Sequence, residues 1–160
     1  MGVKSFFHEL KVKASHKRLF KALTTDSHHV LPKASDKIKS VETVEGHGVA
    51  PGCVVKSTFH EGALYKYIKN RIDEIDTQNY VGKFTLVEGD VLGDKFEKVC
   101  YEVKLEPTED GGSLIKLKQE YHTKGDYEPT EEEVKAGREE AVELYKACDA
   151  YLAANPHVCA

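Results

Sequence analysis

Apolar and polar residues alternate along the first three-quarters of the chain. In residues 65–73, Ile68, Asn70 and Ile72 share one face of an extended segment, while charged residues take the other. This pattern, with turn signals such as Asp110-Gly111-Gly112 between its runs, predicts strands at residues 4–13, 39–44, 53–59, 65–73, 80–87, 96–105 and 114–122. Short strands joined by short turns predict an antiparallel meander.

Helical patterns flank these strands. Two short helices are expected after the first strand, at residues 15–23 with Ser15 as N-cap, and at residues 26–31, where Asp26 caps and Pro32 helps to end the helix. Acidic residues after Pro129 begin a third helix of about 25 residues, roughly 37 Å long, which is enough to cross the sheet. The combination predicts one α+β domain over residues 1–160.

Several positions expected to face inward are polar or small, although a solid core would use Leu, Ile and Phe there. They are His8, Ser57, Asn70, Gly82, Tyr101, Gln119 and Arg138. A few polar groups in an apolar cavity are typical of a ligand pocket. The alternative is that some of them lie at strand ends in water.

The composition argues against several classes of function. A net charge of -4 offers no basic excess for nucleic acid, and no apolar run is long enough for a membrane span or a secretory signal. The four cysteines form no C-x-x-C pair, which favours free thiols in a reducing, cytoplasmic compartment. Six of the eight histidines stand alone or as the adjacent His28-His29 pair, without metal-ligand spacing, so neither a metal site nor a cofactor is expected.

A set of short motifs recurs in order along the whole chain: residues 18–22, 45–52, 73–76, 88–90, 97–99, 110–113, 121–126 and 151–152. With these motifs the chain resembles, nearly end to end, the plant pathogenesis-related class 10 proteins, the family of the major birch pollen allergen. The resemblance implies a helix-grip fold: a seven-stranded curved antiparallel sheet wrapped around a long C-terminal helix, with two short helices in a V, enclosing a large cavity. It also implies a cytoplasmic plant defence protein that binds flavonoids, cytokinins, phenolics or sterols, in a family that includes allergens. We expect a monomer.

The expected ligand-binding residues are those predicted to line the cavity: His8, Leu23, Ile38, Val55, Ser57, Phe59, Ile68, Asn70, Gly82, Phe84, Val99, Tyr101, Val103, Gln119, Arg138, Ala141 and Tyr145. The glycine-rich loop, with Gly46, Gly48 and Gly52, is one residue longer than the family pattern. Val55 stands where the family commonly has a cavity lysine, and Gly82 where it has a tyrosine. We therefore expect a more apolar cavity that is roomier near Gly82.

Two other hypotheses stay open beside the carrier hypothesis. An enzyme of specialised metabolism would use His8, Tyr101, Arg138 or Tyr145 as acid, base or anchor. A weak ribonuclease, an activity credited to the family, would use the glycine-rich loop with Glu97, Asp149 and Tyr151. The loop lacks the Lys-Ser/Thr ending of a phosphate-binding P-loop, so a structural hairpin is expected there.

Overall fold

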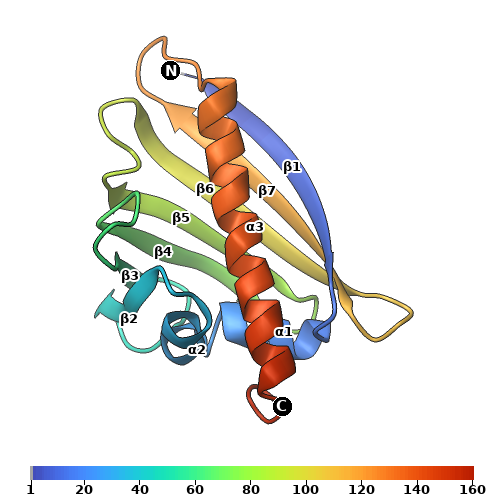
Figure 1. The fold of residues 1–160 in the computed structure, drawn as a ribbon. Coiled ribbons are helices and arrows are strands. Elements are labelled where there is room, and N and C mark those ends of the chain that lie inside the picture. The colour runs from blue at the N-terminus through green and yellow to red at the C-terminus, as the bar shows by residue number, and fades with distance from the viewer. Residues whose placement is uncertain (1) are drawn as a thin grey trace.

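One antiparallel sheet curves around a long helix in the computed structural model, which describes residues 2–160 (Figure 1). The sheet has the order β1-β7-β6-β5-β4-β3-β2. Its strands are β1 (Val3–Val12), β2 (Ile38–Glu45), β3 (Val54–Phe59), β4 (Tyr67–Asp76), β5 (Val81–Gly89), β6 (Phe96–Pro107) and β7 (Ser113–Thr123). Each strand from β2 to β6 pairs with the strand that follows it in the sequence, and β1 pairs with the remaining edge of β7. The predicted seven-stranded α+β fold is therefore confirmed.

Two short helices follow β1: α1 (His16–Leu23) and α2 (Ser27–Ala34). The Ser15 hydroxyl caps α1 by accepting a hydrogen bond from the Arg18 amide, as predicted. The prediction for α2 was wrong in two details. The Asp26 side chain makes no cap hydrogen bond, and the helix continues two residues past Pro32. Proline removes only its own N–H, and the Ser35 amide still donates to the Leu31 carbonyl at 3.0 Å.

The long helix α3 (Glu131–Ala154) crosses the concave face of the sheet (Figure 1). Thr130 and Glu133 form a capping box at its start. At its other end, the Arg18 guanidinium donates to the carbonyls of Leu152, Asn155 and Val158 at 2.8–3.1 Å. Leu152 belongs to the last turn of α3, and Asn155 and Val158 follow the helix, so Arg18 of α1 fixes the C-terminal end of α3.

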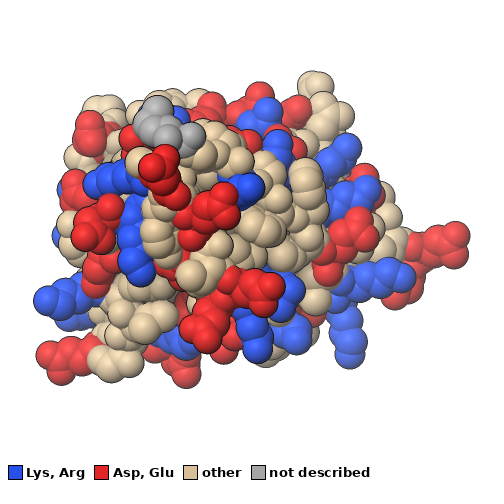
Figure 2. All heavy atoms as spheres, turned by 90° about the horizontal axis from the view of Figure 1, so that it is seen from above, with Lys and Arg blue, Asp and Glu red and all other residues tan. Residues whose placement is uncertain are grey.

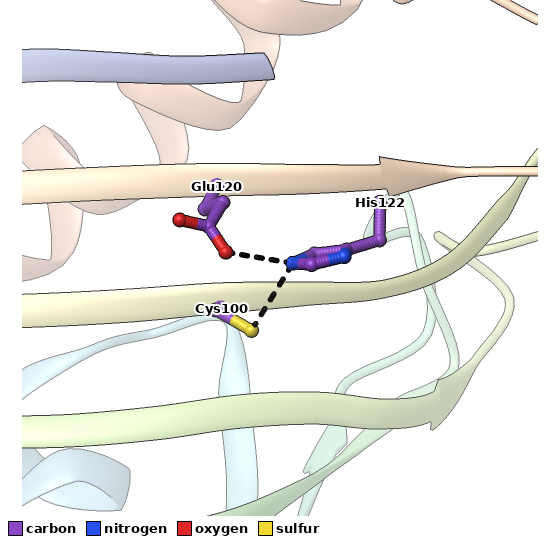
Figure 3. A group of neighbouring side chains, drawn as sticks. All are labelled: Cys100, Glu120 and His122. Carbon is purple, nitrogen blue, oxygen red and sulfur yellow. Dashed lines mark hydrogen bonds and ion pairs between the residues drawn. The ribbon is translucent and has the colours of Figure 1, made fainter. Parts of the chain in front are cut away.

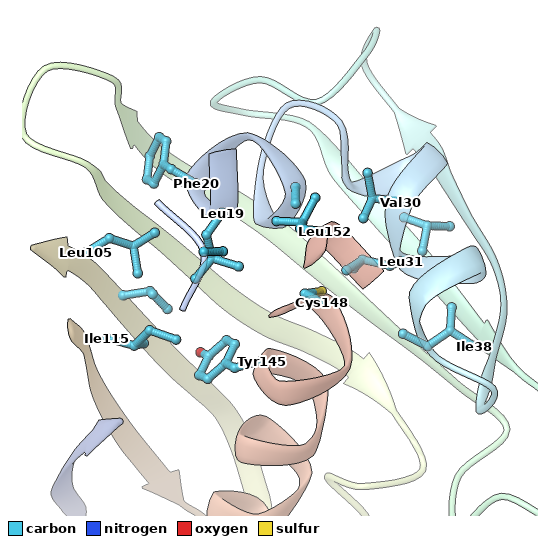
Figure 4. Close-up of a cluster of buried hydrophobic side chains, with 14 of the residues drawn as sticks. Leu19, Phe20, Val30, Leu31, Ile38, Leu105, Ile115, Tyr145, Cys148 and Leu152 are labelled. Atoms are coloured by element: carbon cyan, nitrogen blue, oxygen red, sulfur yellow. The ribbon is translucent and has the colours of Figure 1, made fainter. Parts of the chain in front are cut away.

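The core divides into two clusters. The larger one packs α1, α2 and the C-terminal half of α3 against the sheet, with Leu19, Cys148 and Leu152 fully buried (Figure 4). The second consists of Leu86, Leu92, Phe96, Val99 and Tyr121. All three buried residues of α3 come from position 145 onward. The N-terminal half of α3 is therefore less deeply buried, and it contacts the second cluster through Val134.

Within residues 2–160, no helix combines the length and the hydropathy that a bilayer span requires. Figure 2 shows acidic and basic side chains interspersed over the face seen from above Figure 1. Such mixing on this face does not form the continuous positive area that phosphate backbones favour.

Candidate ligand cavity

A cavity of ≈ 530 Å³ lies between the inner face of the sheet and α3. Most of the residues predicted to line it do so: Leu23, Ile38, Val55, Ser57, Phe59, Ile68, Asn70, Gly82, Phe84, Tyr101, Val103, Gln119, Ala141 and Tyr145. Alternate residues of the strands supply one wall, because strand side chains point to opposite faces in turn. Gly137, Glu140, Ala141 and Leu144, at helical spacing on α3, supply the other.

Two amide side chains place unpaired hydrogen-bond acceptors at the wall of the cavity. Asn70 Oδ1 on β4 and Gln119 Oε1 on β7 are buried and have no hydrogen-bond partner among residues 2–160. Gln119 is only 1% exposed, and its Nε2 donates to the Gly137 carbonyl at 3.3 Å, which fixes the amide. Buried acceptors are nearly always satisfied in folded proteins. Both oxygens therefore suit a ligand that carries hydrogen-bond donors.

Two tyrosines line the inner part of the cavity. Burial raises the pKa of both Tyr101 and Tyr145 above the ordinary phenol value. Both hydroxyls consequently stay protonated at neutral pH, and each can donate a hydrogen bond to a ligand or accept one from it. A raised pKa leaves almost no phenolate to act as a base at neutral pH, so the arrangement suits orientation of a bound molecule more than proton abstraction.

Charged side chains lie together in one part of the lining, where the segment between α2 and β2 faces α3. Lys37 forms an ion pair and hydrogen bond with Glu143, and Asp36 and Glu140 lie beside them. The hydrogen bond to Glu143 is the largest cause that raises the pKa of Lys37. Both members of the pair are well exposed, so we take this part of the lining as the mouth of the cavity. Sequence reasoning missed this pair, because nothing in the local pattern connects residues 106 positions apart.

Three residues predicted to line the cavity do not line it. Arg138 is an exposed residue on α3. Val99 points to the expected side of β6, but it is 2% exposed and packs in the second core cluster. His8 lies on β1, the edge strand, with its Nε2 buried and unpaired. Burial and the charge of Arg138 lower the pKa of His8, while contact with Gln119 opposes them.

Some lining residues were missed because they lie outside regular strands. Val49 belongs to the loop between β2 and β3, and Tyr65 precedes β4, so strand alternation applies to neither. Leu144 had a usable signal. It lies three residues after Ala141 and seven after Gly137, which is the spacing of one helical face.

The sequence matches the model of the Pathogenesis-related protein Bet v 1 family over residues 1–155. The chain belongs to the Bet v 1 family. One relative within it, "Major allergen Pru av 1" of Prunus avium, is 46% identical over 157 residues, which is 98% of each chain.

Solved structures agree with the Bet v 1 fold. The crystal structure of Ara h 8.0201 matches with a TM-score of 0.85 and 36% identity, over 96% of this chain and all of the other. Norcoclaurine synthase from Thalictrum flavum, in complex with dopamine and hydroxybenzaldehyde, matches with a TM-score of 0.73 at 21% identity, over 96% of this chain and 88% of the other. At that identity the second likeness concerns the fold alone.

Val55 and Gly82, the two residues expected to depart from the Bet v 1 family pattern, both lie in the cavity lining. Val55 lines it, whereas Lys56 turns outward and places its Nζ 4.9 Å from the centre of the Tyr67 ring. The extra room expected near Gly82 is not there. A Cβ at Gly82 would lie 3.0 Å from Cζ of Phe84, so the Phe84 ring already occupies the space that a side chain at position 82 would use.

The glycine-rich loop of this Bet v 1 protein is a hairpin connection, as predicted. Gly46, Gly48 and Gly52 all have positive φ, which favours glycine. At Gly46 a Cβ would also lie 2.6 Å from Cys53 Sγ. The Gly52 amide donates to the Ile72 carbonyl at 2.8 Å and is therefore not available to cradle a phosphate.

The residues of the ribonuclease hypothesis are far apart. Glu97 is exposed on β6 beside the end of β7, where Phe96 pairs with Thr123. Asp149 instead accepts hydrogen bonds from the amides of Lys13 and Ala14, at the end of the sheet where β7 begins. The length of β7, at about 3.3 Å per residue, puts roughly 30 Å between them. They cannot act together on one ribose.

Proposed function

We propose that this protein is a carrier of small amphiphilic plant metabolites, with flavonoids, cytokinins, phenolics and sterols as the candidate classes, and that it serves in plant defence. The observation that carries the proposal is the cavity of ≈ 530 Å³, whose lining is apolar apart from a few placed polar groups. That volume is within the range of small-molecule sites, which is about 300–1,000 Å³.

The polar groups favour a ligand that bears hydroxyl or N–H groups. Asn70 Oδ1 and Gln119 Oε1 would accept hydrogen bonds from it, and the phenols of Tyr101 and Tyr145 would orient it. Apolar burial would supply most of the affinity, at about 25 cal/mol per Å². This chemistry fits a hydroxylated aromatic or hormone-like molecule better than a plain hydrocarbon.

A carrier is favoured over an enzyme by the state of the ionisable groups. The cavity tyrosines have raised pKa values, and the Lys37 ammonium is held by Glu143 at the mouth. None of these three groups has its pKa shifted toward the value that a base or nucleophile needs at neutral pH. We further propose a cytoplasmic location, supported by four free cysteines, and a monomer, because one chain completes the cavity.

The test uses purified protein with one flavonoid, one cytokinin and one sterol, first by thermal shift and then by calorimetry. A ligand that binds only the folded state must raise its stability. The blocking variant is Ala141→Phe, which fills the cavity from α3. The matched control is Ala150→Phe, the same change at an exposed position of the same helix.

We expect micromolar or tighter binding of at least one class, its loss in Ala141→Phe and its retention in Ala150→Phe. Asn70→Val should weaken a hydroxylated ligand by about 2- to 10-fold, which is the value of one hydrogen bond, and leave its O-methylated analogue unchanged. Saturable binding that survives Ala141→Phe unaltered, or no binding across the panel, would refute the carrier proposal.

A further inference from the structure

A second group of reactive side chains lies outside the cavity, on the outer face of β6 and β7. Cys100 and Glu120 are directly opposite each other in the β6–β7 register, and His122 follows Glu120 by two residues on the same face. Figure 3 shows the three side chains converging between the two strands. Sequence spacing alone gave no sign of this group, because its members come from two strands.

The geometry of the group is that of a chelate. His122 Nε2 lies 2.7 Å from Glu120 Oε1 and 3.7 Å from Cys100 Sγ. One donor atom from each residue lies within 4.8 Å of the other two. A nucleophile relay would place the thiol and the carboxylate on different imidazole nitrogens. Here both face the same nitrogen, so the three donors surround one point in space.

We propose that Cys100, Glu120 and His122 bind one divalent transition-metal ion of the Zn²⁺ class. With metal–ligand distances of about 2.0–2.3 Å in a tetrahedral site, adjacent donor atoms lie roughly 3.3–3.6 Å apart. The sulfur–nitrogen separation of 3.7 Å is about 0.1 Å above this range. The oxygen–nitrogen pair has to open by well under 1 Å, a change that a rotation of the Glu120 carboxylate supplies.

The surroundings leave room for the fourth ligand and support the first three. A depression of ≈ 150 Å³ lined by Cys100 and Glu120, with Asp73 at its side, adjoins the group and admits a water molecule. Glu120 Oε2 lies 3.7 Å from Lys118 Nζ, which orients the carboxylate from the side away from His122. The Thr85 hydroxyl lies 3.8 Å from Cys100 Sγ.

Binding changes the protonation of the group but not its oxidation state. The Cys100 thiol loses a proton to solvent, and the thiolate and the Glu120 carboxylate then balance the two positive charges of the metal. A thiolate with an imidazole selects Zn²⁺ or Co²⁺ over Mg²⁺ and Ca²⁺, which prefer oxygen ligands. This site is distinct from the cavity and does not depend on the carrier proposal.

The experiment is a titration of the full chain with Co²⁺, in the presence of a phosphine reductant, followed by the sulfur-to-cobalt charge-transfer absorption in the near ultraviolet. We expect one equivalent of Co²⁺ to give this absorption and Zn²⁺ to displace it, while Mg²⁺ has no effect. Cys100→Ser should abolish the absorption. Glu120→Gln and His122→Gln should each weaken binding by at least about tenfold.

The matched control is Cys159→Ser, which removes the other partly exposed cysteine and should leave the titration unchanged. Circular dichroism of each variant establishes that it is folded. Absorption that persists in Cys100→Ser, absorption lost in Cys159→Ser, or equal affinity in all folded variants would each overturn the proposal. Failure of the carrier test would leave these outcomes unaffected, since the two sites share no ligating residue.

Discussion

The substitution Gly137→Ala tests how closely α3 approaches the sheet. Glycine in a helix interior is about 1 kcal/mol less favourable than alanine, so this position carries a cost that needs a structural reason. A Cβ at Gly137 would lie 2.3 Å from the Tyr121 hydroxyl oxygen, more than 1 Å inside ordinary contact. The Tyr121 ring cannot swing away, because Phe6 and Phe96 pack against it at centroid distances of 5.8 and 5.5 Å.

Two opposing effects set the change in the free energy of unfolding caused by Gly137→Ala. Overpacking of this kind costs about 1–3 kcal/mol, against a gain of about 1 kcal/mol from helix propensity. Gly137→Ala should therefore lower the free energy of unfolding by up to about 2 kcal/mol. In a Tyr121→Phe background the hydroxyl is gone, and the nearest atoms to the methyl added at position 137 are at 3.7 and 3.8 Å. There Gly137→Ala should raise the free energy of unfolding by about 1 kcal/mol.

The assay is a double-mutant cycle measured by urea unfolding and circular dichroism, since the chain has no tryptophan. The coupling energy between the two positions should be about 1–3 kcal/mol. In this size range each kcal/mol corresponds to about 2–4 °C in melting temperature. If Gly137→Ala stabilised both backgrounds equally, the close approach of α3 to Tyr121 would be refuted.

Three further predictions concern the edge strand, the mouth and the helix start. His8 has a lowered pKa in the folded state, so the unfolded chain takes up its proton first as pH falls below about 6.5 and stability declines there; His8→Gln should flatten the loss of unfolding free energy between about pH 7.5 and pH 5. An unchanged slope would contradict the assignment. Glu143→Gln breaks the pair with Lys37 and should speed ligand dissociation measured by stopped flow, while stability changes by less than about 1 kcal/mol because the pair is exposed. Thr130→Ala removes the capping box and should cost about 1 kcal/mol and raise amide exchange in the first turns of α3; uniform exchange along the helix would argue against it.

The sequence predicted those parts of the fold that depend on local pattern. The strands, their antiparallel order from β2 to β7 and the long last helix follow from periodicity and turn residues. The pairing of β1 with β7 does not, because it joins segments about 110 residues apart and no local pattern connects them. Strand ends were displaced by up to three residues, the largest shift being in β4, which begins at Tyr67 and ends at Asp76.

The cavity was predictable where strand parity decides the direction of a side chain, as at Ser57, Asn70 and Tyr101. Parity gives the face of the sheet but not the position along it, which is why Val99 is in the core instead. On α3, Arg138 was misplaced because helix phase changes by 100° per residue, and its neighbour Gly137 faces the sheet. The ion pair at the mouth required knowledge of tertiary structure.

The uneven burial of α3 has a consequence for how such a protein diverges. The residues that anchor the helix most deeply, Cys148 and Leu152, do not line the cavity, whereas Glu140, Ala141 and Leu144 line it and are only partly buried. Substitutions in the first set are expensive, because each removes a buried contact. Those in the second set change the shape and polarity of the cavity at small cost in stability. Selection can therefore alter what the cavity accepts through one half of α3 while the other half keeps the fold unchanged.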